Sequence, residues 1–265
     1  MKKKIIGIIP ARMGASRFPG KPMALINGFP MIGHVYHRAL SSKKLDDLYV
    51  ATCDQIIFDF IQSIGGKACM TSPAHTRATD RCAECLEYLE KKIQSKINIA
   101  VMIQGDEPMI NGEMIDSALE PIISGEAEVS NLCAALYEQE EVDDPNEIKV
   151  VFSKDKNALY FSRKAIPHKP LGPKILSYKQ ICIIPFTREA LIKFNSLEST
   201  PLEISESIDM LRFLENGIPV KMVETIHNSY SVDTPEDLSF VEEQFINHPT
   251  QMPCIDQISL DKLNI

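Results

Sequence analysis

The chain has 265 residues, of which 44% are hydrophobic and 24% are charged, the balance of a globular protein that can bury a large core. Asp and Glu outnumber Lys and Arg by 36 to 28, and a net charge of −8 argues against nonspecific binding to nucleic acid or an anionic membrane. No apolar run reaches the roughly 20 residues of a membrane span, and the seven cysteines are typical of reduced thiols. We therefore expect a cytoplasmic protein.

Short apolar runs alternate with amphipathic stretches of helical length, which predicts βαβ units on a mainly parallel sheet. The predicted strands are Lys4–Ile9, Leu48–Thr52, Lys67–Met70, Ile97–Ile103, Glu128–Leu136 and Val220–Val223. The predicted helices, with apolar residues three and four apart, are Pro30–Ser41, Gln55–Ile64, Thr79–Ile93 (with Thr79 as N-cap) and Asn111–Ile123. The pattern predicts an α/β fold with a doubly wound, mainly parallel sheet flanked by helices.

The rhythm of the sequence changes after residue 142. Closely spaced strands are predicted at Ile148–Phe152, Ala158–Phe161 and Tyr178–Ile184, as a smaller antiparallel β region inserted at about 145–200. One helix is predicted at Glu203–Glu215, and another starts at Thr234-Pro235, where Thr is a favoured N-cap and Pro a favoured first residue. We expect residues 1–247 to form a single domain and residues 248–265 a C-terminal tail.

A basic loop follows the first predicted strand and carries Arg12, Arg17 and Lys21. The carboxyl end of such a strand is where an open α/β sheet binds its ligand. Guanidinium and ammonium groups suit a polyphosphate ligand. A solvated surface loop is the alternative interpretation.

The loop sequence from Ile8 to Pro22 resembles the opening motif of CMP-sugar synthetases, and most closely that of 3-deoxy-manno-octulosonate (Kdo) cytidylyltransferases. Four further segments continue the resemblance in the family's order: Gln104-Gly105-Asp106-Glu107-Pro108, the ALYFSR stretch at 158–163, Pro201-Leu202-Glu203 and the VDTPEDL stretch at 232–238. The resemblance implies a nucleotide-diphospho-sugar transferase-like fold, and a homodimer paired through the inserted β region. It also implies CTP and a 2-keto sugar acid, with Kdo as first choice, as substrates for bacterial lipopolysaccharide or capsule synthesis.

The implied reaction is attack of the sugar's anomeric hydroxyl on the α-phosphorus of CTP, with pyrophosphate leaving. Such a transfer depends on positioning and charge neutralisation and requires no protein nucleophile. By resemblance, the nucleotide-binding residues are Pro10, Ala11, Arg12, Arg17, Lys21, Thr79 and Arg81. The residues implied to act in catalysis are Arg12, Lys21 and Asp106.

Two aspartates stand at places suited to a metal. Asp106 follows the apolar run Ile97–Ile103 in a glycine-proline turn, and Asp233 directly precedes a predicted helix. Mg²⁺ takes one or two protein carboxylates and completes its shell with water and phosphates. Turn or capping roles are the alternative for both residues. The resemblance implies that Asp106 and Asp233 bind Mg²⁺.

The acceptor side departs from the family pattern. By resemblance, Gln104, Arg163 and Glu203 line the sugar pocket, but the His and Tyr expected there are read as Ile181, Pro185 and Ile204. Lost polar groups leave sugar hydroxyls without partners, so another acid (an amino-Kdo, a nonulosonate or a phosphonate) and an idle nucleotide-binding homologue stay as alternatives. The family's Ser-Gly near the base is Arg77-Ala78 here, and Arg77 either turns outward or adds a phosphate contact.

Overall fold

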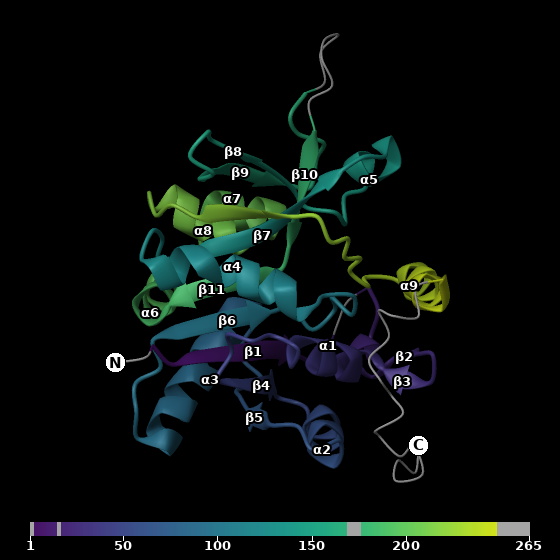
Figure 1. Ribbon diagram of the computed structural model, residues 1–265, viewed down its shortest axis with the longest axis vertical. Helices are drawn as coiled ribbons and strands as arrows, with labels where there is room; N and C mark the ends of the chain where they lie inside the picture. The colour runs from purple at the N-terminus through teal and green to yellow at the C-terminus, as the bar shows by residue number, and fades with distance from the viewer. Residues whose placement is uncertain (1–2, 15–16, 169–175, 248–265) are drawn as a thin grey trace.

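Two five-stranded sheets form the centre of the molecule and lie one above the other in Figure 1. The computed structural model describes residues 3–14, 17–168 and 176–247. The predicted tail at 248–265 therefore lies outside the described residues. No helix in the described part of the chain is both long and apolar enough to cross a membrane.

The first sheet has the strand order β11-β6-β1-β4-β5. Its strands are β1 (Ile5–Ala11), β4 (Asp47–Thr52), β5 (Ala68–Met70), β6 (Ile99–Ile103) and β11 (Ile183–Thr187). The first four run parallel and β11 is an antiparallel edge strand. The chain moves outward from β1 to β5 and then returns to β6 on the other side of β1. The order therefore reverses between β1 and β6, the position at which doubly wound sheets bind their ligands.

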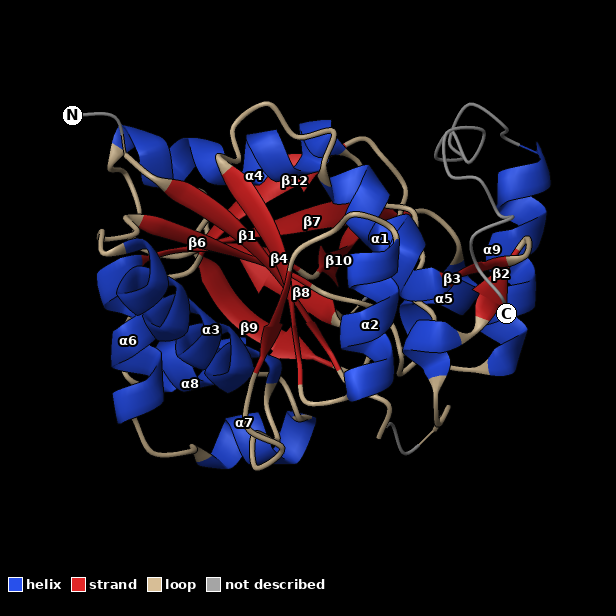
Figure 2. Cartoon of the chain, turned by 90° about the horizontal axis from the view of Figure 1, so that it is seen from below, coloured by secondary structure: helices blue, strands red, loops and turns tan. Residues whose placement is uncertain are grey.

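Helices cover both faces of this sheet because both faces are apolar. On β1, Ile5 and Ile9 pack with α1 (Met31–Ala39), α2 (Gln55–Ser63) and α4 (Gly112–Ser124). Ile6 and Ile8 face the opposite side, where α3 (Ala78–Ile93), α6 (Arg188–Ser196) and α8 (Met210–Glu215) pack. Figure 2 shows these helices around the strands. The predicted α/β fold with helices on both faces of a mainly parallel sheet is confirmed.

The second sheet has the order β12-β7-β10-β8-β9. Its strands are β7 (Ser130–Leu136), β8 (Lys149–Phe152), β9 (Ala158–Ser162), β10 (Ser177–Ile181) and β12 (Lys221–Thr225). The inserted strands β8–β10 are antiparallel to their neighbours, as predicted. The strands predicted at Glu128–Leu136 and Val220–Val223 do not extend the first sheet, because β7 and β12 pair with each other and β7 pairs with β10.

The prediction of one strand at Tyr178–Ile184 is wrong. The chain leaves the second sheet after Ile181 and enters the first sheet at Ile183, so Cys182 is the crossing point between the sheets. Two buried polar side chains fix the crossing: the Asn131 amide donates to the Ile181 carbonyl, and the Cys182 N–H donates to the Glu107 carboxylate.

Two helix predictions are also corrected. The stretch Glu203–Glu215 is two helices, α7 (Pro201–Glu206) and α8, because Ser207 takes a left-handed conformation with φ 57°. Helix α3 begins at Ala78 with Arg77 as its N-cap, so Thr79 lies inside the first turn. By contrast, α9 (Pro235–Asn247) begins as predicted, and the Thr234 hydroxyl accepts a hydrogen bond from the Asp237 N–H.

The remaining elements are short. They are the 3-10 turn η1 (Lys21–Met23), the hairpin strands β2 (Leu25–Ile26) and β3 (Phe29–Pro30), and helix α5 (Gln139–Asp143). The hairpin and α9 lie together at one side of the molecule (Figure 1) and share a small apolar cluster.

Candidate active site

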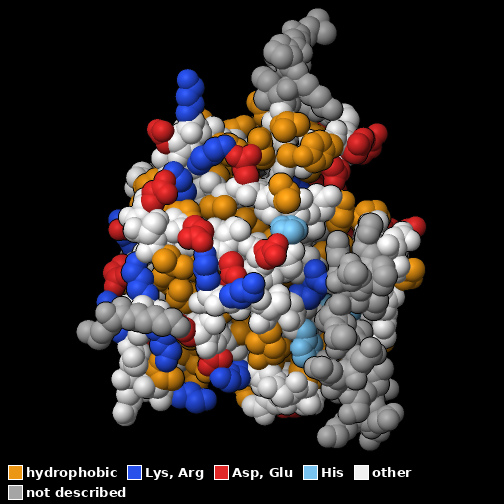
Figure 3. Space-filling view, viewed as in Figure 1, with side chains coloured by type: hydrophobic (Ala, Val, Ile, Leu, Met, Phe, Trp, Pro, Cys, Tyr) orange, Lys and Arg blue, Asp and Glu red, His pale blue; other side chains and the backbone are white. Residues whose placement is uncertain are grey.

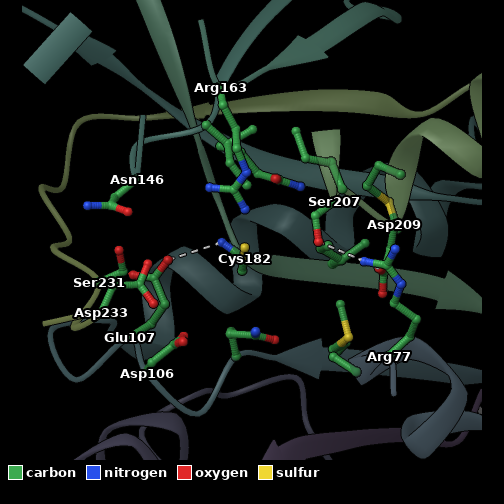
Figure 4. A pocket seen from close by; sticks show the side chains of 18 of the residues that line it. Arg77, Asp106, Glu107, Asn146, Arg163, Cys182, Ser207, Asp209, Ser231 and Asp233 are labelled. Carbon is green, nitrogen blue, oxygen red and sulfur yellow. Dashed lines mark hydrogen bonds and ion pairs between the residues drawn. The ribbon is translucent and has the colours of Figure 1, made fainter. Parts of the chain in front are cut away.

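Two adjoining cavities open at the carboxyl ends of β1 and β6. The first, which we call the basic cavity, has a volume of about 310 Å³ and is lined by the first loop and the start of α3. The second, the inter-sheet cavity, has a volume of about 240 Å³ and is lined by residues of both sheets (Figure 4). They share part of their lining, namely Arg17, Thr76, Arg77, Ala78, Gln104, Asp106, Ser207 and Asp233. A ligand in one cavity can therefore touch a ligand in the other.

Five cationic side chains line the basic cavity, and these are Arg12, Arg17, Lys21, Arg77 and Arg81. Pro10 and Ala11, the last residues of β1, form its floor with Gly105. A Cβ on Gly105 would lie 2.8 Å from the Pro10 carbonyl oxygen, so the close approach of these two chain segments requires glycine. An excess of positive charge in a hollow of this kind favours an anionic ligand.

The carboxylates of Asp106 and Asp233 meet at the first loop. The Lys21 ammonium lies 2.6 Å from an Asp106 oxygen and 3.0 Å from an Asp233 oxygen, and it also donates to the Val232 carbonyl. Burial lowers the pKa of Lys21, but the two carboxylates raise it more, so its pKa lies above the ordinary value. Two acids 127 positions apart in the chain thus share one cation.

This carboxylate pair fits a divalent cation. Its oxygens are hard donors, and they already surround a positive charge. No cluster of three or more His, Cys, Asp or Glu suited to a metal occurs among the described residues. A metal held here would therefore complete its shell with water or ligand oxygens, which is the usual behaviour of Mg²⁺.

Arg17 ties the first loop to both cavities. Its guanidinium lies 3.0 Å from an Asp233 oxygen and donates to the side chain of Asn146, in the segment that precedes β8. Arg12 is more exposed and donates to the His75 carbonyl at 3.5 Å. Arg81 is buried and donates to the Thr71 hydroxyl and to two backbone carbonyls, so it supports the wall of the basic cavity.

Gln104 stands between the two cavities, directly after β6. Its backbone N–H donates to the Cys182 carbonyl, but its buried side-chain oxygen has no hydrogen-bond partner among the described residues. Because an unpaired buried oxygen is costly, this side chain is suited to a ligand that supplies a donor.

Arg163 enters the inter-sheet cavity from the second sheet (Figure 4). Its guanidinium donates to the carbonyls of Glu206 and Pro145, which are neutral groups, and its backbone N–H donates to the Glu206 carboxylate. The side chain is thus held in position while its charge is free to bind an anion such as a carboxylate.

Arg77 turns inward and lines both cavities. Its guanidinium lies 3.4 Å from Asp209 and 3.5 Å from Glu203, and it donates to the Ser207 hydroxyl, as the dashed line in Figure 4 marks. Burial raises the pKa of Asp209, and the Thr79 hydroxyl and Arg77 partly offset this increase. The break between α7 and α8 therefore brings an acid to the start of α3.

Thr79 and Glu203 line neither of the two cavities. The Thr79 hydroxyl is buried and donates to Asp209. Glu203 is fully buried, forms a two-pronged ion pair with Arg212 and accepts from the Thr200 N–H at the start of α7. Both residues thus contact residues that line the cavities, Thr79 through Asp209 and Glu203 through Arg77, and direct ligand contacts for them stay predictions.

The residues that stand where the family's His and Tyr were expected do not lie in the inter-sheet cavity. Ile181 and Pro185 are buried in the two sheets, and Ile204 is 63% exposed on α7, so none of them lines the inter-sheet cavity. The side chains that face this cavity from the crossing segment are Gln180, Cys182 and Ile184. Side chains alternate between the two faces of a strand, so the residues that face the cavity are one position away from those expected.

Several lining residues were not predicted from the sequence. They are Asn146, Glu147, Gln180, Cys182, Ser207, Asp209 and Ser231. Glu107 belongs to the motif that follows β6, but the sequence predicts no function for it. It is buried, burial raises its pKa to about 7, and it accepts hydrogen bonds from Ser229 and the Cys182 N–H. The Asp-Pro-Asn turn at 144–146 was the one local signal that a loop enters here.

The switch-point position, the cationic loop and the paired carboxylates define the site of a nucleotidyltransferase. The family model described as cytidylyltransferase matches residues 6–243. The chain therefore belongs to the cytidylyltransferase family, and the predicted enzyme class is confirmed.

Named relatives agree with this assignment. The chain is 41% identical over 246 residues to 3-deoxy-manno-octulosonate cytidylyltransferase of Thermodesulfovibrio yellowstonii, covering 90% of this chain and 96% of the relative. It is 41% identical over 241 residues to 8-amino-3,8-dideoxy-manno-octulosonate cytidylyltransferase of Shewanella frigidimarina, covering 89% and 96%.

A solved structure of CMP:2-keto-3-deoxy-manno-octonic acid synthetase complexed with CTP is also similar. It superposes with a TM-score of 0.83 at 34% identity, over 92% of this chain and 99% of that one. The nucleotidyltransferase fold that the sequence predicted is thereby confirmed.

Proposed function

We propose that this enzyme transfers CMP from CTP to a 2-keto-3-deoxy sugar acid, with Kdo as the first-choice acceptor, and releases pyrophosphate. One observation carries the proposal: the Asp106 and Asp233 carboxylates converge on Lys21 where the basic cavity meets the inter-sheet cavity. The reacting phosphate and the acceptor hydroxyl must meet at such a junction. The names of the similar proteins support both substrates.

The first loop binds the triphosphate in this proposal. Arg12, Arg17 and Lys21, supported by Arg81, supply positive charge in a hollow whose floor is Pro10 and Ala11. Fixed cations stabilise the charge that develops on departing pyrophosphate. Asp106 lines both cavities and is bonded to Lys21, so we assign these two residues, with Arg12, the catalytic roles.

Asp106 and Asp233 would hold a divalent cation, for which we propose Mg²⁺ because both donors are carboxylate oxygens. When bound, such an ion polarises a phosphate and lowers the pKa of a bound hydroxyl. Lys21 pairs with both carboxylates and neutralises them when no metal is present. When a metal binds, the Lys21 ammonium can bind a phosphate instead.

The inter-sheet cavity holds the acceptor. The Arg163 guanidinium is placed to bind the sugar carboxylate, and the unpartnered Gln104 oxygen is placed to accept from a sugar hydroxyl. Gln180 supplies a further polar side chain to the cavity lining, to which Cys182 and Ile184 also belong. An amino-Kdo is the second candidate, because a relative of equal identity is named for the 8-amino acid.

The direct test is a panel of acceptors. Purified protein is incubated with CTP, Mg²⁺ and either Kdo, 8-amino-Kdo, a nonulosonate or a phosphonate, and pyrophosphate release is measured with a no-acceptor control. We expect the highest kcat/KM with Kdo. Turnover of another acid without turnover of Kdo would remove the first choice, and no release with any acid would remove the proposed function.

We further propose that two copies pair through the inserted β region. Hydrophobic side chains gather around the outer part of β10 in Figure 3. Tyr137 is 63% exposed and follows Leu136, the β7 residue that pairs with the start of β10. Leu159 on the edge strand β9 is 62% exposed.

Sedimentation analysis should give a dimer, and Tyr137→Glu should shift it to monomer. A wild-type monomer at micromolar concentration would contradict the pairing.

A further inference from the structure

A buried lysine lies at the base of the β8–β9 hairpin, outside the residues assigned to the reaction. Lys149 is the first residue of β8 and its side chain is fully buried. Its ammonium donates to three main-chain carbonyls, those of Asp144 at 2.6 Å, Glu147 at 2.5 Å and Arg163 at 2.8 Å. No described carboxylate lies within ion-pair distance of it.

These three bonds use every donor that a lysine has. Burial lowers the pKa of Lys149, while the nearby charges of Asp144 and Glu147 counteract this effect. A buried charge is tolerated where its hydrogen bonds are all made. The ammonium therefore acts as a fixed node that joins three points of the backbone.

The joined points belong to the two chain segments that enter and leave the hairpin. The entering segment, residues 144–148, carries Asn146 and Glu147 into the inter-sheet cavity. The leaving segment begins with Arg163, and the Arg163 guanidinium donates back to the Pro145 carbonyl on the entering segment. The position of the Arg163 charge thus depends on a loop that Lys149 holds.

We propose that Lys149 is a positioning residue for the acceptor half of the site: it fixes the Arg163 guanidinium and the 144–148 segment without touching the substrate. The inference rests on the proposed acceptor role of the inter-sheet cavity. It also has a consequence independent of that role, because loss of the node must loosen these two segments. None of the three residues whose carbonyls bind the Lys149 ammonium lines the basic cavity, but the Arg17–Asn146 hydrogen bond links that cavity to the 144–148 segment. Because Arg17 is also held by Asp233, nucleotide binding should change less than acceptor binding.

The test uses Lys149→Met, which keeps the length of the side chain and removes the donors, and Lys149→Gln, which retains two donors. Lys156→Met is the matched control, since Lys156 lies on the same hairpin but has a half-exposed side chain that pairs with Glu224. Thermal denaturation with and without CTP shows whether each variant folds and keeps the nucleotide site.

Two readouts decide the matter. In amide hydrogen exchange without ligand, Lys149→Met should exchange faster than Lys156→Met at residues 144–148 and 163–164, and no faster in β1 or α3. In steady-state assays the KM for the sugar acid should rise about tenfold to a hundredfold, with a clearly smaller rise in the KM for CTP. Lys149→Gln should fall between Lys149→Met and wild type.

The outcomes separate the inference from the proposed function. Unchanged exchange at 144–148 and 163–164, or equal increases in both KM values, would overturn the role of Lys149. Loss of CTP-dependent stabilisation in both Lys149 variants would also overturn it, because the residue would then support the whole fold. If wild-type protein turns over no sugar acid, the proposed function fails, and the exchange result still decides whether Lys149 holds the two segments.

Discussion

The Lys21 ammonium lies 2.6 Å from the Asp106 carboxylate and joins the loop after β1 to the loop after β6. These loops meet at the point where the strand order of the first sheet reverses. The same ammonium reaches Asp233 at the start of α9. Three segments far apart in the chain therefore converge on one charged group, and the predictions below concern the groups around it.

Asp106→Asn should lose at least about a hundredfold in kcat and remain folded. The substitution keeps the shape of the side chain but removes one of the two charges that would hold the cation. Pyrophosphate release against Mg²⁺ concentration measures the effect, and denaturation checks the fold. Glu189→Gln, at an exposed ion pair with Lys96, is the control. Wild-type turnover in Asp106→Asn would contradict the metal role.

Arg77→Met should raise the KM for CTP by about tenfold, equivalent to about 1.4 kcal/mol. The guanidinium is one of five cations around the basic cavity, and its removal weakens the binding of a polyanion. Kinetics with CTP varied at saturating acceptor measure the change. An unchanged KM for CTP together with a raised KM for the acceptor would show that Arg77 serves the inter-sheet cavity instead.

Asp237→Ala should lower the free energy of unfolding by about 1 kcal/mol, the usual contribution of a helix cap. The Asp237 carboxylate accepts from the N–H groups of Asp233 and Thr234. Because the bond to Asp233 fixes the backbone of a proposed metal ligand, the Mg²⁺ concentration for half-maximal rate should also rise. Asp237→Asn keeps an acceptor oxygen and should lie nearer wild type. An unaltered Mg²⁺ dependence in Asp237→Ala would separate the cap from the metal site.

His34 should make stability depend on pH between about 4 and 6.5. Burial lowers its pKa to about 4, while the Nε2–H donates to the Ile26 carbonyl and the ring stacks on Phe245 of α9. The folded protein thus holds this ring neutral, whereas the unfolded chain protonates it. The contribution of His34 to stability is therefore fully present above pH 6.5 and decreases as pH falls towards 4. The full effect is about 3 kcal/mol.

Chemical denaturation of His34→Gln across this pH range tests the assignment. The amide of glutamine can still donate to Ile26 but does not titrate, so the slope of stability against pH should flatten relative to wild type. His227→Gln, at a histidine near the surface that pairs with Glu113, is the control. Equal slopes in wild type and His34→Gln would contradict the prediction.

The sequence predicted the first sheet well because its signals are local. Both faces of β1 and β6 are buried, so these strands are continuous apolar runs, and the helices between them show the spacing of one apolar face. The start of α9 was equally clear, because Thr234 and Asp237 satisfy its N–H groups within four residues.

The errors share a different cause. Helix α3 starts before Thr79 because an acid from a distant segment, Asp209, interacts with its first turn. The strand at 178–184 divides at Cys182 because Asn131 and Glu107 bind the carbonyl and the N–H of the peptide bond between Ile181 and Cys182. Partners separated by 50 residues or more leave no mark in a local pattern. The same holds for the strand register, which places Gln180 rather than Ile181 in the lining of the inter-sheet cavity.

The passage of the chain between sheets at Cys182 gives the two cavities partly separate linings. Glu147, Arg163 and Gln180 line only the inter-sheet cavity, whereas Pro10, Ala11, Arg12 and Lys21 line only the basic cavity. Substitutions at the first three residues can therefore reshape the inter-sheet cavity while the basic cavity keeps its lining. With the functions proposed for the two cavities, such an enzyme can exchange its sugar while it keeps its nucleotide.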